Sequence, residues 1–270
     1  MTSHSSSPSP SPTSSEGGVT APHLAPAGHP PGLAGRVVLV TGGTGGLGRG
    51  VVRTFLEAGA RVHVPVFSDD ELGPFREALG DAADAVHIHR DADLTDPETA
   101  QRIVSEVTEA GEGPLRVLVH LAGGFAMGPV EETEPDTWIR MMAMNATTTF
   151  HMARAAFTAM RDGGGGRILT VSALPALDRG AAGMSAYGAS KAAVLNLTRT
   201  LAREGVEHGI TANSVLPSII DTPGNREAMP DADTDHWLAP ADIGRVLAFL
   251  ASDDAAIVNG AALPLTLGEG

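Results

Sequence analysis

Short apolar runs alternate along this chain with longer segments of helical periodicity, beginning at Arg36. The first run, 37–40, is continuously apolar, as is typical of a strand buried on both faces of a parallel sheet. Strands are predicted at 37–40, 61–67, 85–89, 115–121, 167–172, 210–216 and 261–267. Helices are predicted through 51–56 and at 69–79, 97–110, 135–160, 184–208 and 240–251. Pro65 is an awkward member of the second strand, because proline cannot donate a ladder hydrogen bond.

Strands that alternate with helices of about ten or more residues indicate an α/β fold, with a parallel sheet covered by helices on both faces. No internal repeat or linker follows residue 33, so we predict one domain at 33–270. Residues 1–32 are mainly Ser, Pro, Gly, Thr and Ala, and they lack the basic start and apolar core of a secretory signal. Such a segment buries too little apolar surface to offset its chain entropy, so we predict a disordered tail.

Composition and charge exclude several classes of function. The formal net charge is −14 and the 18 Lys and Arg residues are dispersed, so we expect no nucleic-acid partner. The chain has no cysteine, which excludes thiol catalysis and cysteine metal sites. No apolar run approaches the ~18–20 residues of a membrane span, and we expect a cytoplasmic protein. His87 and His89 alternate around Ile88 as in a strand, and we interpret them as structural residues rather than metal ligands.

Tyr187 and Lys191 are the only tyrosine and the only lysine of the chain, and they lie four residues apart in a predicted helix. Residues at this spacing share a helix face, so the phenol and the ammonium point into the same space. A neighbouring cation lowers the phenol pKa from about 10, which favours proton exchange near neutral pH. By itself the spacing is more typical of a surface tyrosine and a solvated lysine. The interpretation therefore depends on the other parts of the site.

A glycine-rich loop follows the first predicted strand and opens the first helix, with the sequence Thr41-Gly42-Gly43-Thr44-Gly45-Gly46-Leu47-Gly48. Glycine lets the backbone turn sharply and approach a pyrophosphate, and the helix N-terminus favours its negative charge. The alternative is a glycine-rich turn without a ligand. The position between a strand and a helix favours a dinucleotide loop.

The loop and the distant Tyr187-x-x-x-Lys191 pair together resemble the short-chain dehydrogenase/reductase family, and the resemblance extends from about Arg36 to Leu267. It implies a single-domain Rossmann fold with a doubly wound, seven-stranded parallel sheet, and hydride transfer with a nicotinamide cofactor. Ser172 matches the family's serine after the fifth strand, and Asn145 its asparagine in the helix after the fourth. Without the family, Ser172 would be an ordinary strand-end hydroxyl and Asn145 a capping or core amide.

The resemblance implies a division of labour among these four residues. Tyr187 is expected to protonate the substrate oxygen in reduction and to act as the base in oxidation. Ser172 is expected to hold that oxygen. Lys191 is expected to lower the pKa of Tyr187 and to bind the nicotinamide ribose, while Asn145 holds a water that links Lys191 to solvent. None of these roles requires a metal.

The family pattern also predicts contacts with NAD or NADP. The expected cofactor-binding residues are Thr41, Gly42, Thr44, Gly46, Leu47, Gly48, Phe67, Asp93, Leu94, Ala122, Gly123, Tyr187, Lys191, Pro217, Ile220 and Thr222. Leu121 departs from the family, which has asparagine there. At the end of the second strand, Val66 and Phe67 carry neither the acidic residue typical of NAD enzymes nor a basic one typical of NADP enzymes. Asp69 and Asp70 follow, with no arginine or lysine beside them, which favours NAD.

The segment from Pro217 to about Trp237 stands where the family has a substrate lid, and this compact version resembles the equivalent segment of dihydropteridine reductases. The turn that ends at Phe125 is also similar to theirs. Those reductases, however, lack the serine found here at 172. A pterin reductase therefore stays open beside a reductase or dehydrogenase of carbonyl or alcohol substrates.

A non-catalytic dinucleotide sensor is the alternative from another class of function. The set of Asn145, Ser172, Tyr187 and Lys191 argues against it, because a sensor needs no proton donor. The family resemblance further implies a homo-dimer or homo-tetramer, formed through the predicted helices at 135–160 and 184–208.

Overall fold

The computed structural model describes Met1 and residues 32–177 and 180–267. The disordered tail predicted for 1–32 lies almost wholly outside the described residues. Seven parallel strands form one sheet in the order β3-β2-β1-β4-β5-β6-β7. The strands are β1 Val37–Thr41, β2 Arg61–Pro65, β3 Val86–His89, β4 Leu115–His120, β5 Gly166–Val171, β6 Ile210–Pro217 and β7 Ala262–Leu265.

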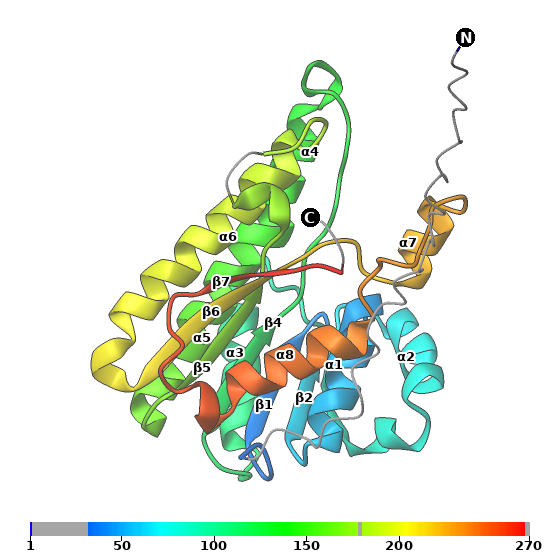
Figure 1. Ribbon diagram of the computed structural model, residues 1–270. Coiled ribbons are helices and arrows are strands. Elements are labelled where there is room, and N and C mark those ends of the chain that lie inside the picture. Colours follow the sequence, from blue (N-terminus) through cyan, green and yellow to red (C-terminus); the bar gives the residue numbers. More distant parts are fainter. Residues whose placement is uncertain (2–31, 178–179, 268–270) are drawn as a thin grey trace.

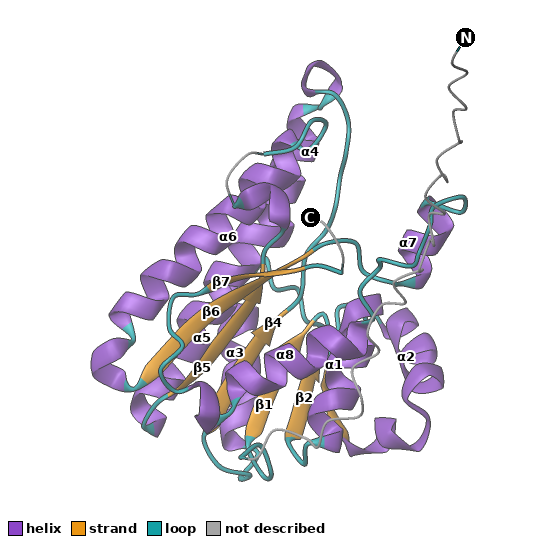
Figure 2. Cartoon of the chain, in the orientation of Figure 1, coloured by secondary structure: helices purple, strands orange, loops and turns teal. Residues whose placement is uncertain are grey.

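Helices cover both faces of this sheet (Figures 1 and 2). They are α1 Gly46–Glu57, α2 Leu72–Leu79, α3 Pro97–Glu109, α4 Pro135–Met141, α5 Thr148–Gly163, α6 Ser185–Glu204, α7 Pro223–Ala228 and α8 Pro240–Ala251. None of the described helices is both long enough and apolar enough to span a membrane.

The sheet separates two apolar cores, because alternate strand residues point to opposite faces. Val38 and Val40 of β1 pack with Phe55 of α1 and Leu247 of α8 in one core. The other core contains Leu39 of β1 and lies under α3, α5 and α6. The predicted single α/β domain with a doubly wound sheet is confirmed. Strand order reverses between β1 and β4, and ligands of such folds bind at the carboxyl ends of the strands on either side of the reversal.

Several predicted elements differ from the structure. The helix predicted at 69–79 begins as a 3₁₀ turn at Asp69–Glu71, and the strand predicted at 261–267 spans only Ala262–Leu265. The strand predicted at 61–67 ends at Pro65, which has no N–H to continue the ladder. The helix predicted at 184–208 ends at Glu204, and a 3₁₀ turn at Val206–His208 follows it. A short helix, α7, lies within the segment that we expected only to form a lid.

The helix predicted at 135–160 is interrupted by a π-helical turn at Met142–Thr147, between α4 and α5. Two side-chain hydroxyls provide donors to backbone carbonyls of this turn. Thr148 Oγ1 donates to Met144 O at 2.6 Å, and Thr149 Oγ1 donates to Asn145 O at 2.6 Å. Such π-helical turns occur frequently at functional sites, and this one carries Asn145.

Candidate active site

The glycine loop forms one wall of a cavity at the carboxyl ends of β1 and β4. Gly42 has φ +64°, and a Cβ atom there would lie 2.8 Å from the backbone nitrogen of Ala122. A side chain at this position would therefore be strained and would collide with the strand end opposite. The loop leads directly into the N-terminus of α1 at Gly46, where free backbone N–H groups favour an anion.

The cavity has a volume of 810 Å³ and fits a dinucleotide in its position and its lining. Predicted cofactor-binding residues that line it are Gly42, Thr44, Gly46, Leu47, Gly48, Phe67, Asp93, Leu94, Ala122 and Gly123. Six other predicted residues do not line it, and these are Thr41, Tyr187, Lys191, Pro217, Ile220 and Thr222. The lining also includes Gly45, Arg49, Pro65, Glu71, Ala92, Thr95, Leu121, Met144 and Thr148, which the sequence analysis missed.

Glu71 is the most informative of the missed residues. The loop after β2 brings its half-buried carboxylate against the glycine loop, where the Thr44 hydroxyl donates a hydrogen bond to it. Arg49 Nε donates to Thr44 O at 2.7 Å from the other side. The acidic residues that favoured NAD in the sequence were Asp69 and Asp70, and both are exposed in the structure. Glu71 could have been noticed in the sequence only as the acidic residue directly before Leu72, the apolar residue that begins α2.

Thr41 supports the cavity from inside the fold. It is fully buried, and its hydroxyl oxygen accepts hydrogen bonds from the backbone N–H groups of Leu121 and Ala122, both at 3.2 Å. It also lies 2.9 Å from Nδ1 of His120, whose Nε2 lies 3.3 Å from the Thr148 hydroxyl. Burial lowers the pKa of His120 to about 3. Thr41 and His120 thus hold the ends of β1 and β4 together.

Tyr187 and Lys191 extend from α6 beside this cavity. The Lys191 ammonium lies 5.9 Å from the centre of the Tyr187 ring and donates to Val171 O at 2.9 Å. A Cβ atom on Gly123 would lie 3.4 Å from Lys191 Nζ, so the ammonium borders a residue of the cavity wall. Phe125 packs edge-on against Tyr187, with ring centres 4.9 Å apart.

Burial moves the pKa values of the pair in opposite directions. It raises the pKa of Tyr187 to about 12 and lowers the pKa of Lys191 to about 8, because a low-dielectric site disfavours both charged forms. The family resemblance implied that Lys191 lowers the pKa of Tyr187. In the protein alone, burial dominates and Tyr187 is a protonated phenol at neutral pH.

Asn145 joins the loop after β4 to α6. Its side chain is fully buried, accepts from Gly124 N at 3.0 Å and donates to Gly124 O at 3.1 Å and Ser190 Oγ at 3.0 Å. A Cβ atom on Gly123 would lie only 2.4 Å from Asn145 Oδ1. The amide therefore fixes the wall residue that borders Lys191. The water-holding role predicted for Asn145 stays a prediction.

The Ser172 hydroxyl is engaged with the backbone. It donates to Lys191 O at 2.8 Å, and only 1% of the residue is exposed. A hydroxyl has one donor, so Ser172 could donate to a carbonyl or alkoxide oxygen of the substrate, as predicted, only after breaking this hydrogen bond. In the structure it ties the end of β5 to the helix that carries Tyr187 and Lys191.

The lid begins at Pro217 and meets the glycine loop through Thr222. A Cβ atom on Gly46 would lie 2.8 Å from the Thr222 Cβ, and the Thr222 hydroxyl accepts from Asn225 N at the start of α7. Ile220 pairs with Leu238 in a β-bridge, which returns the chain to α8. Pro217 is buried at the end of β6. Thr222 is thus the predicted lid residue that contacts the cavity wall.

Comparisons with known proteins agree with this geometry. The family model for short chain dehydrogenases matches residues 36–233. The acetoacetyl-CoA reductase of Shinella zoogloeoides is 31% identical over 244 residues, covering 87% of this chain and 98% of that protein. The 3-oxoacyl-[acyl-carrier-protein] reductase FabG of Vibrio cholerae is 30% identical over 240 residues, covering 86% and 96%.

A solved short-chain type dehydrogenase/reductase from Mycobacterium ulcerans has a similar fold, with a TM-score of 0.79 and 28% identity. The match covers 87% of this chain and 89% of that one. These relatives do not favour the pterin-reductase alternative or the non-catalytic sensor.

Proposed function

Because this chain belongs to the short-chain dehydrogenase/reductase family and is therefore an oxidoreductase that transfers hydride with NAD(P), we propose that Tyr187 is its proton donor and that its preferred cofactor is NAD(H). The observation that carries the proposal is the pair of buried groups beside the cavity. The half-buried phenol of Tyr187 and the Lys191 ammonium lie together where the glycine loop, Gly123 and the end of β5 meet.

The chemistry of reduction requires a proton at the substrate oxygen. The bound nicotinamide supplies or accepts the hydride. Tyr187, protonated at neutral pH, donates its phenolic proton to the developing alkoxide, and in oxidation it accepts a proton from the alcohol. Lys191 stabilises the phenolate that remains, because its pKa of about 8 leaves it mostly cationic at pH 7.

Asn145 and Ser172 each hydrogen-bond to a part of the structure that carries or borders these two groups. Asn145 holds Gly124 and Ser190, so it fixes the cavity wall relative to α6. Ser172 holds the backbone of Lys191. We propose that both position the pair, and that Ser172 contributes less to binding of the substrate oxygen than its match to the family pattern implied.

The preference for NAD over NADP is supported by Glu71. Its carboxylate lines the cavity next to Thr44, on the β2 side, where the adenine ribose of a dinucleotide binds in this fold. A carboxylate accepts a hydrogen bond from a free ribose 2′-hydroxyl and repels a 2′-phosphate. Arg49 also lines the cavity, but it donates to Thr44 O within the loop.

A titration with both reduced dinucleotides tests this preference. We expect NADH to bind at least about tenfold more tightly than NADPH, a difference of ~1.4 kcal/mol. Glu71→Gln should reduce the ratio of the affinity for NADH to the affinity for NADPH. Asp70→Asn, which removes an exposed neighbouring charge, should leave this ratio unchanged. Equal affinities in the wild-type protein would refute the preference for NAD.

The substrate class is proposed from the chemistry of the site and from the named relatives. We propose a small carbonyl compound, or the corresponding alcohol, with 3-oxoacyl thioesters as first candidates. Oxidation of NADH should be followed spectrophotometrically across acetoacetyl-CoA, short ketones and aldehydes. Binding of the cofactor without turnover of any of these would count against the proposed reaction.

We also propose a homo-dimer or homo-tetramer through the segments at 135–160 and 184–208. Trp138, Ile139 and Phe150 support this, because α4 and α5 expose these large apolar side chains. Light scattering coupled to gel filtration measures the mass, and a monomer would contradict the proposal. The cytoplasmic location stays a prediction.

A further inference from the structure

Three histidines and two glutamates form a partly buried cluster outside the cavity, which we call the histidine cluster. Its members are His63, His87, His89, Glu106 and Glu112. His63 of β2 and His87 of β3 are directly paired across the two strands. Their rings stack with centres 4.6 Å apart, and the rings of His63 and His89 stack at 5.3 Å. His63 lies between Val62 and Val64 in sequence, which belong to the core under α1 and α8, so its ring faces the α3 side.

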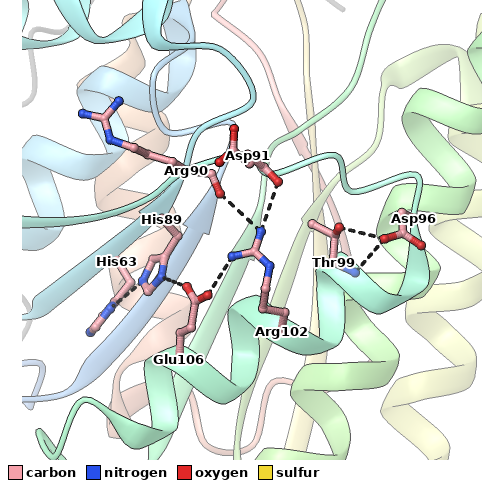
Figure 3. A network of polar contacts seen from close by, with 8 residues as sticks. All are labelled: His63, His89, Arg90, Asp91, Asp96, Thr99, Arg102 and Glu106. Atoms are coloured by element: carbon pink, nitrogen blue, oxygen red, sulfur yellow. Dashed lines mark hydrogen bonds and ion pairs between the residues drawn. The ribbon is translucent and has the colours of Figure 1, made fainter.

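The side chains of the histidine cluster form a continuous chain of polar contacts. Glu106 Oε2 lies 2.7 Å from His89 Nδ1, and His89 Nε2 lies 3.0 Å from His63 Nδ1 (Figure 3). His63 Nε2 in turn lies 3.1 Å from Glu112 Oε2. The other oxygen of Glu112 lies 3.1 Å from His87 Nε2. The chain thus runs from one carboxylate through two imidazoles to a second carboxylate.

A count of protons shows that the neutral rings cannot satisfy this chain. The links Glu106–His89, His89–His63 and His63–Glu112 each need one shared proton. A neutral imidazole carries one N–H, so His63 and His89 supply only two. If His89 donates to Glu106 and His63 donates to His89, the lone pair of His63 Nε2 faces an anionic oxygen of Glu112. In this arrangement, no proton or other cation lies between His63 Nε2 and Glu112 to make their contact attractive.

The contact between His63 and Glu112 lies in the interior of the fold. Only 1% of His63 is exposed, so solvent does not supply the missing hydrogen-bond donor. Lone pairs border this position. His63, His87 and Glu112 each offer one ligand atom, and these atoms all lie within 4.8 Å of one another.

We propose that His63, His87 and Glu112 bind a divalent transition-metal ion, with zinc as the expected occupant. Two imidazole nitrogens and a carboxylate oxygen are a zinc ligand set, and water completes a four-coordinate site. The metal takes the place of the missing proton between His63 and Glu112. The alternation around Ile88 had indicated that His87 is a structural residue, and this inference makes it a metal ligand instead. The inference does not depend on the proposed reaction.

The surrounding groups have the arrangement expected around a metal ligand. A metal-bound histidine usually donates its other N–H to a fixed acceptor, which sets the tautomer and raises the basicity of the ligand. With a metal on Nε2, His63 carries its N–H on Nδ1, which lies 3.0 Å from His89 Nε2, and His89 Nδ1 then donates to Glu106. Glu106 is itself held by Arg102 NH1 at 2.7 Å (Figure 3). The relay from Glu106 to His63 therefore presents Nε2 of His63 as a free lone pair.

Calorimetric titration of the metal-stripped full chain with Zn²⁺ tests the site. We expect one equivalent to bind more tightly than any further equivalents. His87→Gln and Glu112→Gln should each weaken that equivalent by at least about tenfold, and Glu106→Gln by about 10–100-fold while the three ligands remain. His208→Gln removes an exposed histidine elsewhere and should have no effect. The control matters because any accessible imidazole is a potential metal ligand, and His4, His23 and His29 lie in the N-terminal tail.

A second measurement separates loss of metal from loss of fold. His87 is about half exposed, so His87→Gln should melt at the wild-type temperature in the presence of a chelator. Zn²⁺ should raise the melting temperature of the wild-type protein and of His208→Gln but not of His87→Gln. Absence of a tight equivalent in the wild type, or an equivalent that survives both His87→Gln and Glu112→Gln, would overturn the proposal.

Discussion

Lys191 and His63 are both nearly inaccessible basic side chains, but their surroundings differ in charge. Lys191 is 7% exposed and donates to the carbonyl of Val171, and within residues 32–177 and 180–267 it forms no salt bridge. His63 is connected to a carboxylate at each end of its chain of contacts. The active site leaves its buried cation without a counter-charge, and the histidine cluster surrounds an imidazole with excess negative charge. A buried charge without a counter-charge is costly, so each of these two positions is a place where a bound molecule can contribute free energy.

Replacement of Tyr187 should have the largest effect on this comparison. Tyr187→Phe removes the proton donor and keeps the ring that packs against Phe125. We expect kcat to fall by about 10²–10⁴-fold, the usual contribution of general acid catalysis, with the dissociation constant for NADH nearly unchanged. Steady-state kinetics and a binding titration measure the two quantities. A variant that keeps most of its kcat would remove Tyr187 from the mechanism.

Replacement of Lys191 tests whether the buried cation must be a compact ammonium group. Lys191→Arg keeps the charge, but a guanidinium is too large for the ammonium site between Val171 and Gly123. We expect a loss in kcat of about 10²-fold, as for other displacements of a catalytic group. In the wild type, the cationic form is lost as pH rises through about 8, so kcat should decline above that pH. The decline in kcat should move to higher pH in Lys191→Arg. If kcat depends on pH identically in the variant and the wild type, the Lys191 cation has no role in the decline.

Acid should destabilise the fold through His120, a buried imidazole without a carboxylate partner among the described residues. The folded protein binds a proton there only near pH 3, whereas the unfolded chain binds it near pH 6.5. The free energy of unfolding should therefore fall by about 1.4 kcal/mol for each pH unit between about 6 and 4. Urea denaturation at several pH values measures this slope. His120→Gln should reduce the slope, and a slope equal to that of the wild type would assign the acid sensitivity to other groups.

Ser172→Ala should have the smallest effect and separates two roles for one hydroxyl. If Ser172 only donates to Lys191 O, its removal costs about 1 kcal/mol in the free energy of unfolding and changes kcat by less than about threefold. If it binds the substrate oxygen in turnover, kcat should fall by about 10²–10³-fold. We expect the first outcome. Denaturation and kinetic measurements on the same preparation distinguish the two.

Sequence patterns predicted the fold well, because periodicity is a local property. Apolar runs and alternating apolar positions located every strand, and the glycine loop was placed correctly between β1 and α1. Periodicity could not reveal the π-helical turn that carries Asn145, since one residue inserted into a helical turn barely alters a pattern of apolar positions. It also missed α7, which is too short to have a recognisable period.

The site was predicted less completely, because several contacts depend on where loops return in space. Glu71 reaches the cavity only through the geometry of the turn after β2. Ser172 matched a family position in sequence. The direction of its hydroxyl toward Lys191 O, however, depends on how β5 pairs with β6 and how α6 packs beside it. The histidine cluster joins residues 49 positions apart, His63 and Glu112, so no local pattern announces it.

The position of β3 has a consequence for association between molecules. β3 is an edge strand of the sheet, and an unpaired edge is a template for strand addition by another chain. Here the edge is four residues long, and the exposed ring of His87 is held by the carboxylate of Glu112. A second chain that paired with β3 would have to pass this polar group and the ion pair of Arg90 with Asp69 just beyond it. The short length of β3 and the charged side chains at its end therefore oppose extension of the sheet by another chain.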